Sequence, residues 1–388
     1  MSITKGNFPV AKFSEIRTPF YFYDTDLLRK TLEIVKNESS KYHFHVHYAI
    51  KANSNERILS IINEYGLGVD CVSGGEIEAA LNAGFSAGKI VFAGVGKADW
   101  EINLALDNNI QCFNVESIAE LEVINDIAAS KGKKARVALR VNPEVDAKTH
   151  HYITTGLKEN KFGISMELLD KVLNRVKDLS NIEMIGLHFH VGSQITDLSV
   201  FNDVCERINI VLKMVDAKGI DIRIINVGGG LGINYQDPNG DPIPDFARYF
   251  AIFNENLHVK PGQEVHFEPG RSIVCQCGSL ITRVLYIKEG VNKNFAIVDA
   301  GMTELIRPAL YQAYHRIENI SSDEKPEMYE VVGPVCESSD CFGKEVELNK
   351  SHRGNFIAMR SAGAYGQIMA SQYNCRSLPE AYYSEDLK

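Results

Sequence analysis

The chain has 388 residues, of which 45% are hydrophobic and 23% charged, and its formal net charge is −9. This composition excludes a disordered chain, and the acidic balance argues against a nucleic-acid or anionic-membrane partner, since both require a basic face. No apolar run is long enough to span a membrane and the first residues lead into no signal peptide, so we expect a cytoplasmic protein.

At about 100–200 residues per domain, the length predicts two domains, or one large barrel with an appendage. Strands are predicted at His45–Ile50, Gly68–Val72, Ile90–Gly94, Cys112–Glu116, Arg136–Asn142, Met184–Val191, Arg223–Gly228 and Glu264–Glu268. Amphipathic helices are predicted between them, among others at Asn55–Tyr65, Gly75–Ala83, Ser117–Ser130, Met166–Lys177 and Ser199–Ala217. Ser117, with Glu120 three residues later, is typical of a capping box. Eight strands alternating with helices predict a (β/α)8 TIM-type barrel, with a doubly wound open sheet as the main alternative.

The pattern changes after about residue 270, where strands follow one another without long helices between them. These strands are predicted at Ser272–Lys288, Phe295–Val298, Met328–Val332 and Phe356–Met359. Pro19–Tyr23 is also strand-like and is expected to join them. We therefore expect a pyridoxal-type or other ligand-binding barrel over residues 25–268. A β-rich, sandwich-like domain would comprise residues 1–24 and 269–388.

The cysteines are well separated along the chain and include no CxxC pair. Such spacing is not typical of a disulfide scaffold, a zinc ribbon or a thioredoxin-like site. We expect reduced cysteines that pack as small hydrophobic residues, with one of them in a chemical role. The eight are Cys71, Cys112, Cys205, Cys275, Cys277, Cys336, Cys341 and Cys375.

The functional face of such a barrel is the carboxyl end of its strands. The first barrel strand runs into Lys51, which is either a solvated strand end or an amine placed to form a Schiff base. The seventh runs into Gly228–Gly232, where loops of this fold commonly bind phosphate through backbone N–H groups. The eighth runs into Glu268–Pro269–Gly270–Arg271, whose charged residues are either a surface ion pair or ligands.

The sixth predicted strand contains His188 and His190, which alternation places on one face. This spacing suits zinc or iron ligands and supports a metal hydrolase as an alternative. His43, His45 and His47 repeat the spacing on the first strand, but no set of carboxylate ligands follows from the sequence. Asp70, after the second strand, is either a ligand contact or a structural hydrogen-bond acceptor.

A lysine, a phosphate loop, an acidic residue and a histidine at one rim match the needs of pyridoxal 5′-phosphate. Its aldehyde requires an amine, its pyridine nitrogen a carboxylate, and its ring an aromatic face. No metal is required by this interpretation.

A series of segments in order along the chain carries a more specific signal. They are Tyr48–Asn53, Gly68–Glu76, Lys161–Gly163, His188–Gln194, Gly228–Gly232, Glu268–Arg271, Arg307–Tyr311, Gly333–Asp340 and Ala362–Gly366. Together they resemble the diaminopimelate decarboxylases, a family of the alanine-racemase-like (fold type III) pyridoxal-phosphate enzymes. The match runs from Thr18–Tyr21 to the C-terminus. It implies loss of CO2 from the D-centre of meso-2,6-diaminopimelate, which gives L-lysine as the last step of lysine biosynthesis.

The resemblance also implies roles for individual residues. Lys51, His190 and Cys336 would be catalytic, as Schiff-base lysine, ring-stacking residue and proton donor. The cofactor would be held by Lys51, His190, Ser193, Gly228, Gly229, Gly230, Glu268, Gly270, Arg271 and Tyr365. The substrate would be held by Arg271, Arg307, Tyr311, Glu337 and Tyr365, with Glu337 on the distal amino group.

In the family that the chain resembles, the segment with Cys336 and Glu337 reaches into the neighbouring subunit's active site, so a homodimer with shared sites is implied. Ornithine, arginine and carboxynorspermidine decarboxylases share the lysine, the glycine loop and the Glu-Pro-Gly-Arg segment, and are the nearest alternatives. A non-catalytic pyridoxal-phosphate-binding protein is a further one. The Arg307–Tyr311 pair and the cysteine segment favour a substrate with a distal amino acid head.

Overall fold

The computed structural model describes residues 5–145 and 161–387. The chain forms two compact units. Leu32–Gly232 with Asp245–Gly270 is called the barrel unit; Met1–Thr31, Ile233–Pro244 and Arg271–Lys388 make up the β unit. Within the described part of the chain, no helix combines the length and the apolar character that a membrane span needs.

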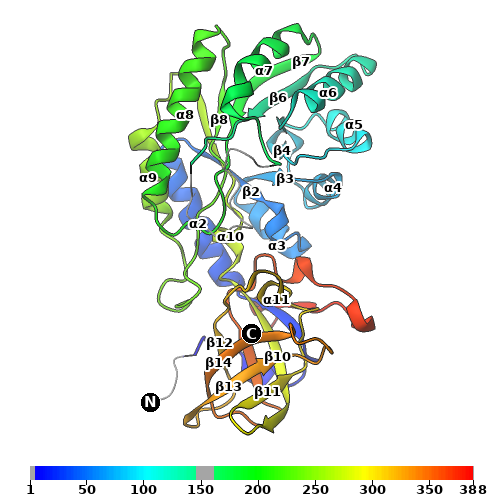
Figure 1. The fold of residues 1–388 in the computed structure, drawn as a ribbon, viewed down its shortest axis with the longest axis vertical. Helices are drawn as coiled ribbons and strands as arrows, with labels where there is room; N and C mark the ends of the chain where they lie inside the picture. The colour runs from blue at the N-terminus through cyan, green and yellow to red at the C-terminus, as the bar shows by residue number, and fades with distance from the viewer. Residues whose placement is uncertain (1–4, 146–160, 388) are drawn as a thin grey trace. The chain divides into compact units, whose positions relative to one another are not determined.

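Eight parallel strands close on themselves in the barrel unit, and helices surround them (Figure 1). In order they are β2 (His45–Ala49), β3 (Gly68–Cys71), β4 (Ile90–Phe92), β5 (Cys112–Val115), β6 (Ala135–Arg140), β7 (Ile182–His188), β8 (Ile224–Asn226) and β9 (Glu264–Phe267). Small and branched side chains pack together from β4 to β8, namely Val91, Cys112, Ala138, Ile185 and Ile224. The closure confirms the predicted (β/α)8 barrel over the open sheet.

Most barrel helices lie where the apolar period predicted them. The helices are α2 (Thr25–Ser40), α3 (Glu56–Glu64), α4 (Gly74–Asn82), α5 (Asp99–Asp107), α6 (Ile118–Ser130), α7 (Met166–Asp178), α8 (Val200–Ala217) and α9 (Phe246–Asn256). Of these, α2, α5 and α9 were not among the predicted ranges. Ser117 caps α6 as expected, since its Oγ accepts from the Glu120 N–H at 3.1 Å. The Glu120 carboxylate accepts from the Glu116 N–H at 2.7 Å, one residue earlier than in a standard capping box.

The β unit is built on one mixed eight-stranded sheet. Its strands are β1 (Phe20–Tyr23), β10 (Gly278–Glu289), β11 (Asn294–Val298), β12 (Ile317–Asn319), β13 (Pro326–Val332), β14 (Cys341–Asn349), β15 (Phe356–Met359) and β16 (Glu380–Tyr383). A register shift between Val284 and Tyr286 divides β10, whose first part pairs with β1 and β15 and whose second part pairs with β11. The two halves of the expected sandwich therefore share one long bent strand.

Short helices interrupt this sheet at three places, α1 (Val10–Phe13), α10 (Arg271–Val274) and α11 (Arg307–Tyr311). The strand predicted from Ser272 therefore begins later, at Gly278. A Cβ at Gly278 would lie 2.3 Å from the Gly363 Cα, so the chain needs glycine for this close approach.

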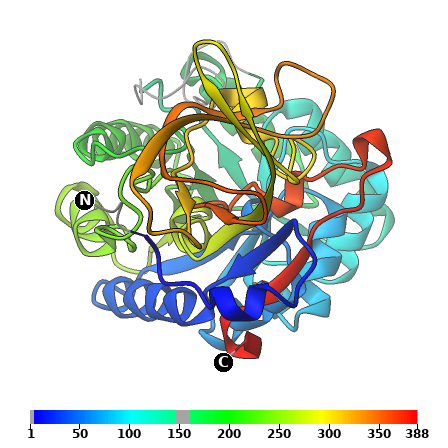
Figure 2. The same cartoon turned by 90° about the horizontal axis from the view of Figure 1, so that it is seen from below.

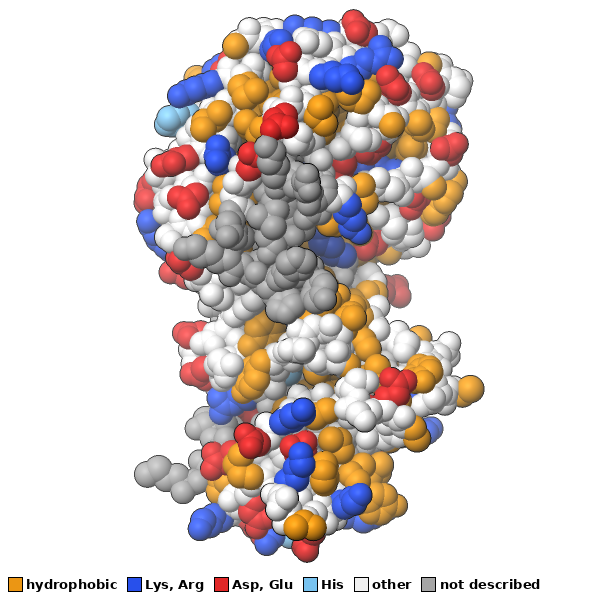
Figure 3. Space-filling view, in the orientation of Figure 1, with side chains coloured by type: hydrophobic (Ala, Val, Ile, Leu, Met, Phe, Trp, Pro, Cys, Tyr) orange, Lys and Arg blue, Asp and Glu red, His pale blue; other side chains and the backbone are white. Residues whose placement is uncertain are grey.

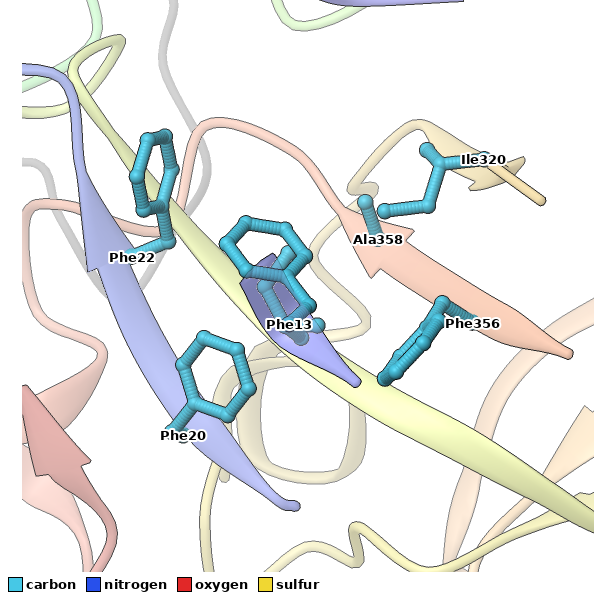
Figure 4. Packing of buried hydrophobic residues seen from close by; sticks show 7 residues of the cluster. Phe13, Phe20, Phe22, Ile320, Phe356 and Ala358 are labelled. Atoms are coloured by element: carbon cyan, nitrogen blue, oxygen red, sulfur yellow. The ribbon is translucent and has the colours of Figure 1, made fainter. Parts of the chain in front are cut away.

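The N-terminal strand belongs to the β unit, as its sequence predicted. β1 pairs antiparallel with β10 and parallel with β16, and Figure 2 shows β1 in blue beside β16 in red. The aromatic side chains of this region form a buried cluster with aliphatic residues of neighbouring strands (Figure 4). Its members are Phe13, Phe20, Phe22, Ile281, Ile320, Phe356 and Ala358. The N-terminus thus supplies three of the rings that the sheet needs for its core.

His315, which precedes β12, makes the stability of the β unit depend on pH. Its ring is 2% exposed, and its Nδ1–H donates to the Arg360 carbonyl at 3.0 Å. Burial, together with the Arg307 guanidinium, lowers the pKa of His315 to about 3. The ordinary pKa of about 6.5 returns in the unfolded chain, which therefore binds the proton first. The contribution of neutral His315 is complete above about pH 6.5 and is lost, by about 1.4 kcal/mol per pH unit, as the pH falls toward 3.

The substitution His315→Gln is expected to flatten this dependence, because the amide still donates to the Arg360 carbonyl but does not titrate. Urea unfolding of both proteins at about pH 5 and about pH 7 measures the difference. Equal pH slopes for the wild type and the variant would show that His315 is not the titrating group.

Candidate active site

Lys51 lies just past the carboxyl end of the first barrel strand. β2 ends at Ala49, one residue earlier than predicted, and a turn of 3₁₀ helix, Ile50–Ala52, carries the lysine. The Tyr48 hydroxyl donates to the Asn53 carbonyl at 2.9 Å and closes this turn. The Lys51 side chain is 40% exposed, so its amine is accessible to a small molecule.

Asp70, at the end of β3, lies next to this amine. Its Oδ2 is 3.7 Å from the Lys51 Nζ, and neither of its carboxylate oxygens, both buried, has a hydrogen-bond partner among the described residues. Burial and the nearby Glu268 carboxylate raise the pKa of Asp70 well above its usual value. A buried carboxyl group without hydrogen bonds indicates a site that a polar ligand completes.

Glu268 follows β9 and is held inside the barrel mouth by three side chains. Its Oε1 accepts from the Asn226 amide at 2.6 Å and from the Asn114 amide at 3.3 Å. Its Oε2 accepts from the His188 Nε2–H at 3.0 Å. Each donor comes from a different strand, and all three are buried.

The charge on Glu268 is maintained in spite of its burial. Burial acts to raise its pKa, but His188, Lys51 and His190 outweigh this effect and hold the pKa of Glu268 well below its usual value. An ionised, buried carboxylate suits a cationic partner such as a protonated pyridine nitrogen.

His190 lies two residues beyond the end of β7. Its Nδ1 accepts from the Gly229 N–H at 3.3 Å, which orients the ring and leaves the proton on Nε2. Burial, then the charges of Lys51 and Arg140, lower the pKa of His190 well below its usual value. The ring is therefore neutral near pH 7 and presents an uncharged aromatic face. His188 and His190 take separate partners, Glu268 and Gly229.

The glycine loop after β8 has no room for side chains. A Cβ at Gly228 would lie 2.2 Å from the Phe189 carbonyl, and one at Gly229 would lie 2.3 Å from the Glu268 carbonyl. The Gly230 carbonyl accepts from the Ile195 N–H at 2.9 Å, so the segment after Ser193 runs beside the loop. Exposed backbone amides without side chains suit a phosphate group. The loop, Lys51 and Glu268 therefore fit the phosphate, aldehyde and pyridine nitrogen of pyridoxal phosphate.

The β unit gathers two arginines and several tyrosines. The Arg271 guanidinium donates to the Tyr235 hydroxyl at 2.5 Å and lies 4.9 Å from the Tyr365 ring centre. The Arg307 guanidinium lies 5.7 Å from the same ring and 5.9 Å from that of Tyr311. The Arg307 Nε is buried, and no described residue accepts its hydrogen bond. An unpaired buried donor of this kind suits a carboxylate ligand.

Cys336 and Glu337 lie in the loop between β13 and β14, and both are exposed. The buried Asp340 carboxylate accepts from the Val335 N–H at 2.7 Å and fixes the shape of this loop. The Glu337 carboxylate accepts from the Tyr373 hydroxyl at 2.7 Å. All eight cysteines are free, and five are buried, which agrees with the expectation of reduced, mostly packed thiols.

Sequence reasoning missed Asn114, Asn226 and Tyr235. The two asparagines carry a recognisable signal, because each is a polar residue in an otherwise apolar strand, where a buried amide needs a partner. Tyr235 carries none, since an aromatic residue in a loop is usually a packing residue. Their common partners, Glu268 and Arg271, are brought to them only by the fold.

Comparison with known proteins connects this geometry to a family. The sequence profile of the pyridoxal-binding domain of pyridoxal-dependent decarboxylases matches residues 26–275. A diaminopimelate decarboxylase from Bacteroides thetaiotaomicron is 60% identical over 384 residues, which cover 99% of this chain and 100% of that protein.

Solved structures agree with the sequence comparison. The structure of Helicobacter pylori diaminopimelate decarboxylase complexed with L-lysine has a TM-score of 0.92 and 43% identity, and the alignment covers 97% of this chain and 94% of that one. A lysine/ornithine decarboxylase from Vibrio vulnificus, with a TM-score of 0.83 and 23% identity over 96% of both chains, shares the fold. The chain thus belongs to the diaminopimelate decarboxylase family of pyridoxal-phosphate-dependent decarboxylases.

Proposed function

We propose that this chain removes CO2 from the D-centre of meso-2,6-diaminopimelate and releases L-lysine, as the last step of lysine biosynthesis. The full-length identity of 60% to a diaminopimelate decarboxylase carries this conclusion. When bound, pyridoxal phosphate supplies an electron-accepting ring that takes up the electron pair of the breaking bond to CO2.

In this proposal the barrel residues hold the cofactor. The Lys51 amine binds its aldehyde carbon, and the Glu268 carboxylate keeps a proton on the pyridine nitrogen. The neutral ring of His190 lies against the cofactor ring. Ser193 and the loop Gly228–Gly230 bind the phosphate. Gly270 lies in the segment after Glu268, whose backbone is joined to β2 by the Ala49 N–H, which donates to the Pro269 carbonyl at 3.2 Å.

The residues of the β unit hold the substrate. Arg271 and Tyr365 contact the phosphate or the neighbouring carboxylate, and Arg307 with Tyr311 binds the distal carboxylate through a planar, multidentate guanidinium. Glu337 binds the distal ammonium group and thereby selects which stereocentre reacts. Cys336 delivers the proton from its Sγ to the carbon that has lost CO2.

The substitution Glu337→Ala is expected to lower kcat/KM for meso-diaminopimelate by about 10- to 100-fold, which is the effect of losing one charged hydrogen bond. Cofactor affinity should not change. Tyr373→Phe, which removes the hydroxyl that donates to Glu337, should give a smaller loss in the same direction. Steady-state kinetics and a cofactor titration on each variant measure both quantities. Parallel loss of cofactor binding would indicate that Glu337 supports the structure instead.

We also propose a homodimer with shared active sites, in the cytoplasm and without a nucleic-acid partner. Residues 25–268 would bind the cofactor, and residues 1–24 with 269–388 would supply substrate and dimer contacts. A groove of about 810 Å³ in the β unit, lined in part by Pro308, Tyr314 and Phe342, supports a protein contact there. Lys and Arg are interspersed with Asp and Glu on the face drawn in Figure 3, which does not favour nucleic acid.

A mixed dimer tests the shared site directly. Lys51→Ala and Cys336→Ala chains should each be inactive alone, but a heterodimer of the two should regain activity if Cys336 acts in the neighbouring subunit's site. One of its two sites then has both wild-type residues. An inactive heterodimer, or a monomer by light scattering, would contradict the shared arrangement.

The reaction itself is tested by incubating the cofactor-loaded protein with meso-diaminopimelate and assaying CO2 and L-lysine. Equimolar products are expected, with little turnover of the LL isomer, ornithine, arginine or carboxynorspermidine. Preferential turnover of one of the last three would move the chain to a related decarboxylase activity. Failure with every substrate in spite of bound cofactor would favour a non-catalytic binding protein.

A further inference from the structure

A second cluster of ligand-type side chains lies at the opposite, N-terminal ends of the barrel strands. His45 on β2 and His266 on β9 are paired in register, and their ring centres are 4.8 Å apart. Glu264 lies two residues before His266 and its Oε2 is 3.2 Å from the His266 Nε2. One ligand atom from each of the three residues lies within 4.8 Å of the other two.

A chain of hydrogen bonds determines which nitrogen of His266 carries the proton. The His47 Nδ1 lies 3.2 Å from the Lys89 carbonyl, which can only accept, so this nitrogen must donate. Above the ordinary imidazole pKa of about 6.5, the His47 Nε2 is then bare and accepts from the His266 Nδ1–H at 2.9 Å. The Nε2 of His266 is left as a lone pair.

This lone pair faces another acceptor. The His266 Nε2 and the Glu264 Oε2 are 3.2 Å apart, and with a neutral ring no hydrogen lies between them. A cation between the two atoms would convert this repulsion into attraction. The same tautomer is the one that metal-binding histidines adopt when their second nitrogen donates to an outer partner.

We propose that His45, Glu264 and His266 bind a zinc-type divalent ion at the N-terminal end of the barrel, with His47 and the Lys89 carbonyl as the outer hydrogen-bond partners. Two imidazoles and one carboxylate are a set that Zn²⁺ accepts, with water in the fourth position. Zinc needs ligand atoms at about 2.0–2.2 Å, so the exposed His45 side chain has to move by about 1 Å.

Two features show that the site is built and accessible. A Cβ at residue 68 would lie 2.4 Å from the His47 Nδ1 and 2.6 Å from the Lys89 carbonyl, so only Gly68 allows these two groups to meet. A cavity of about 390 Å³, lined among others by His45, His47, Glu264 and His266, opens next to the cluster. Ions and water can therefore enter from solvent.

The position of the ligands indicates what the ion would do. β2 and β9 are the first and last strands of the barrel, and they are paired at only two positions, His45 with His266 and Val46 with Phe267. An ion bound by both strands would hold the barrel closed. His45 lies four strand residues before Ala49, about 13 Å along β2 from the end that leads to Lys51. The ion would stabilise the fold without contacting the proposed decarboxylation site.

Metal binding to the chelator-treated, cofactor-loaded, full-length protein tests the proposal. At about pH 8 the wild type should bind one Zn²⁺ per chain more than His45→Ala does, with at least about 100-fold weaker binding in that variant, and should unfold at a higher temperature when Zn²⁺ is added. His47→Phe, which removes the outer partner, should weaken binding about 10- to 100-fold. His258→Ala, an exposed histidine in the same unit, is the matched control and should bind as the wild type does.

Cobalt distinguishes this cluster from the exposed thiols of Cys336 and Cys375. Co²⁺ held by imidazole and carboxylate gives visible d–d bands without a thiolate charge-transfer band. Equal Zn²⁺ binding by the wild type and His45→Ala, or thiolate bands that vanish in Cys336→Ser, would overturn the proposal. His45 is exposed, so its replacement tests the site even if His266→Ala does not fold. Far-UV circular dichroism and the cofactor's visible absorption verify folding of each variant.

Discussion

Replacing Lys51 with arginine is expected to lower kcat by roughly 10³-fold or more, although the positive charge beside Asp70 is kept. A guanidinium stays protonated at any accessible pH and has no lone pair to offer the cofactor's aldehyde, whereas a lysine amine loses its proton readily. Borohydride treatment followed by peptide mass analysis should attach the cofactor to Lys51 in the wild type and to no peptide in the variant.

Lys134→Ala is the matched control for this change. Lys134 is an exposed lysine of the barrel unit, so its loss should leave both turnover and cofactor attachment unchanged. Turnover of Lys51→Arg near the wild-type rate would contradict the role of Lys51. Inactivity with normal cofactor attachment at another lysine would move that role to the second residue.

The substitution Glu268→Gln is expected to lower kcat by about 10²- to 10³-fold while the protein still binds cofactor. The amide keeps the size of the side chain, but it removes the negative charge that the low pKa of Glu268 maintains inside the barrel. Without that charge, the pyridine nitrogen is no longer held protonated and the ring accepts electrons less well. Steady-state kinetics together with a cofactor titration measure the two effects separately.

Glu255→Gln is the control, because the Glu255 carboxylate is exposed and pairs only with Arg248 at 2.9 Å on the barrel surface. It should change neither quantity. If Glu268→Gln loses cofactor and stability together with activity, the carboxylate serves to hold Asn226 and His188 in place, and its proposed catalytic role is wrong.

Local signals predicted the architecture well where period and strand chemistry coincide. The barrel follows from short apolar runs alternating with amphipathic segments, and β1 was assigned to the second unit because Phe20–Tyr23 is strand-like and precedes the barrel. α5 (Asp99–Asp107) was missed because it is only nine residues long, and a helix of about that length has few turns in which a period can show. β14 was missed because the segment Gly343–Glu347 carries charges that a period-2 pattern does not explain.

Placement of single residues at the rim was also predictable, because the carboxyl ends of parallel strands meet at one face of a barrel. Lys51, Gly228–Gly230 and Glu268 could be proposed in this way from chain position alone. Their roles still depend on the resemblance to a family and on the experiments above.

What the sequence by itself determined is therefore the fold class, the family and the residues that follow each strand, since these depend on neighbours along the chain. The tertiary structure decided which side chains meet. Asn114 and Glu268 are 154 residues apart, and His47 and His266 are 219 apart, yet each pair shares a hydrogen bond. Charge states and tautomers arise from such contacts, because burial and a fixed partner at about 3 Å change the free energy of a proton far more than sequence neighbours do. The chemistry of both the cofactor site and the proposed metal site is in this sense a property of the closed barrel.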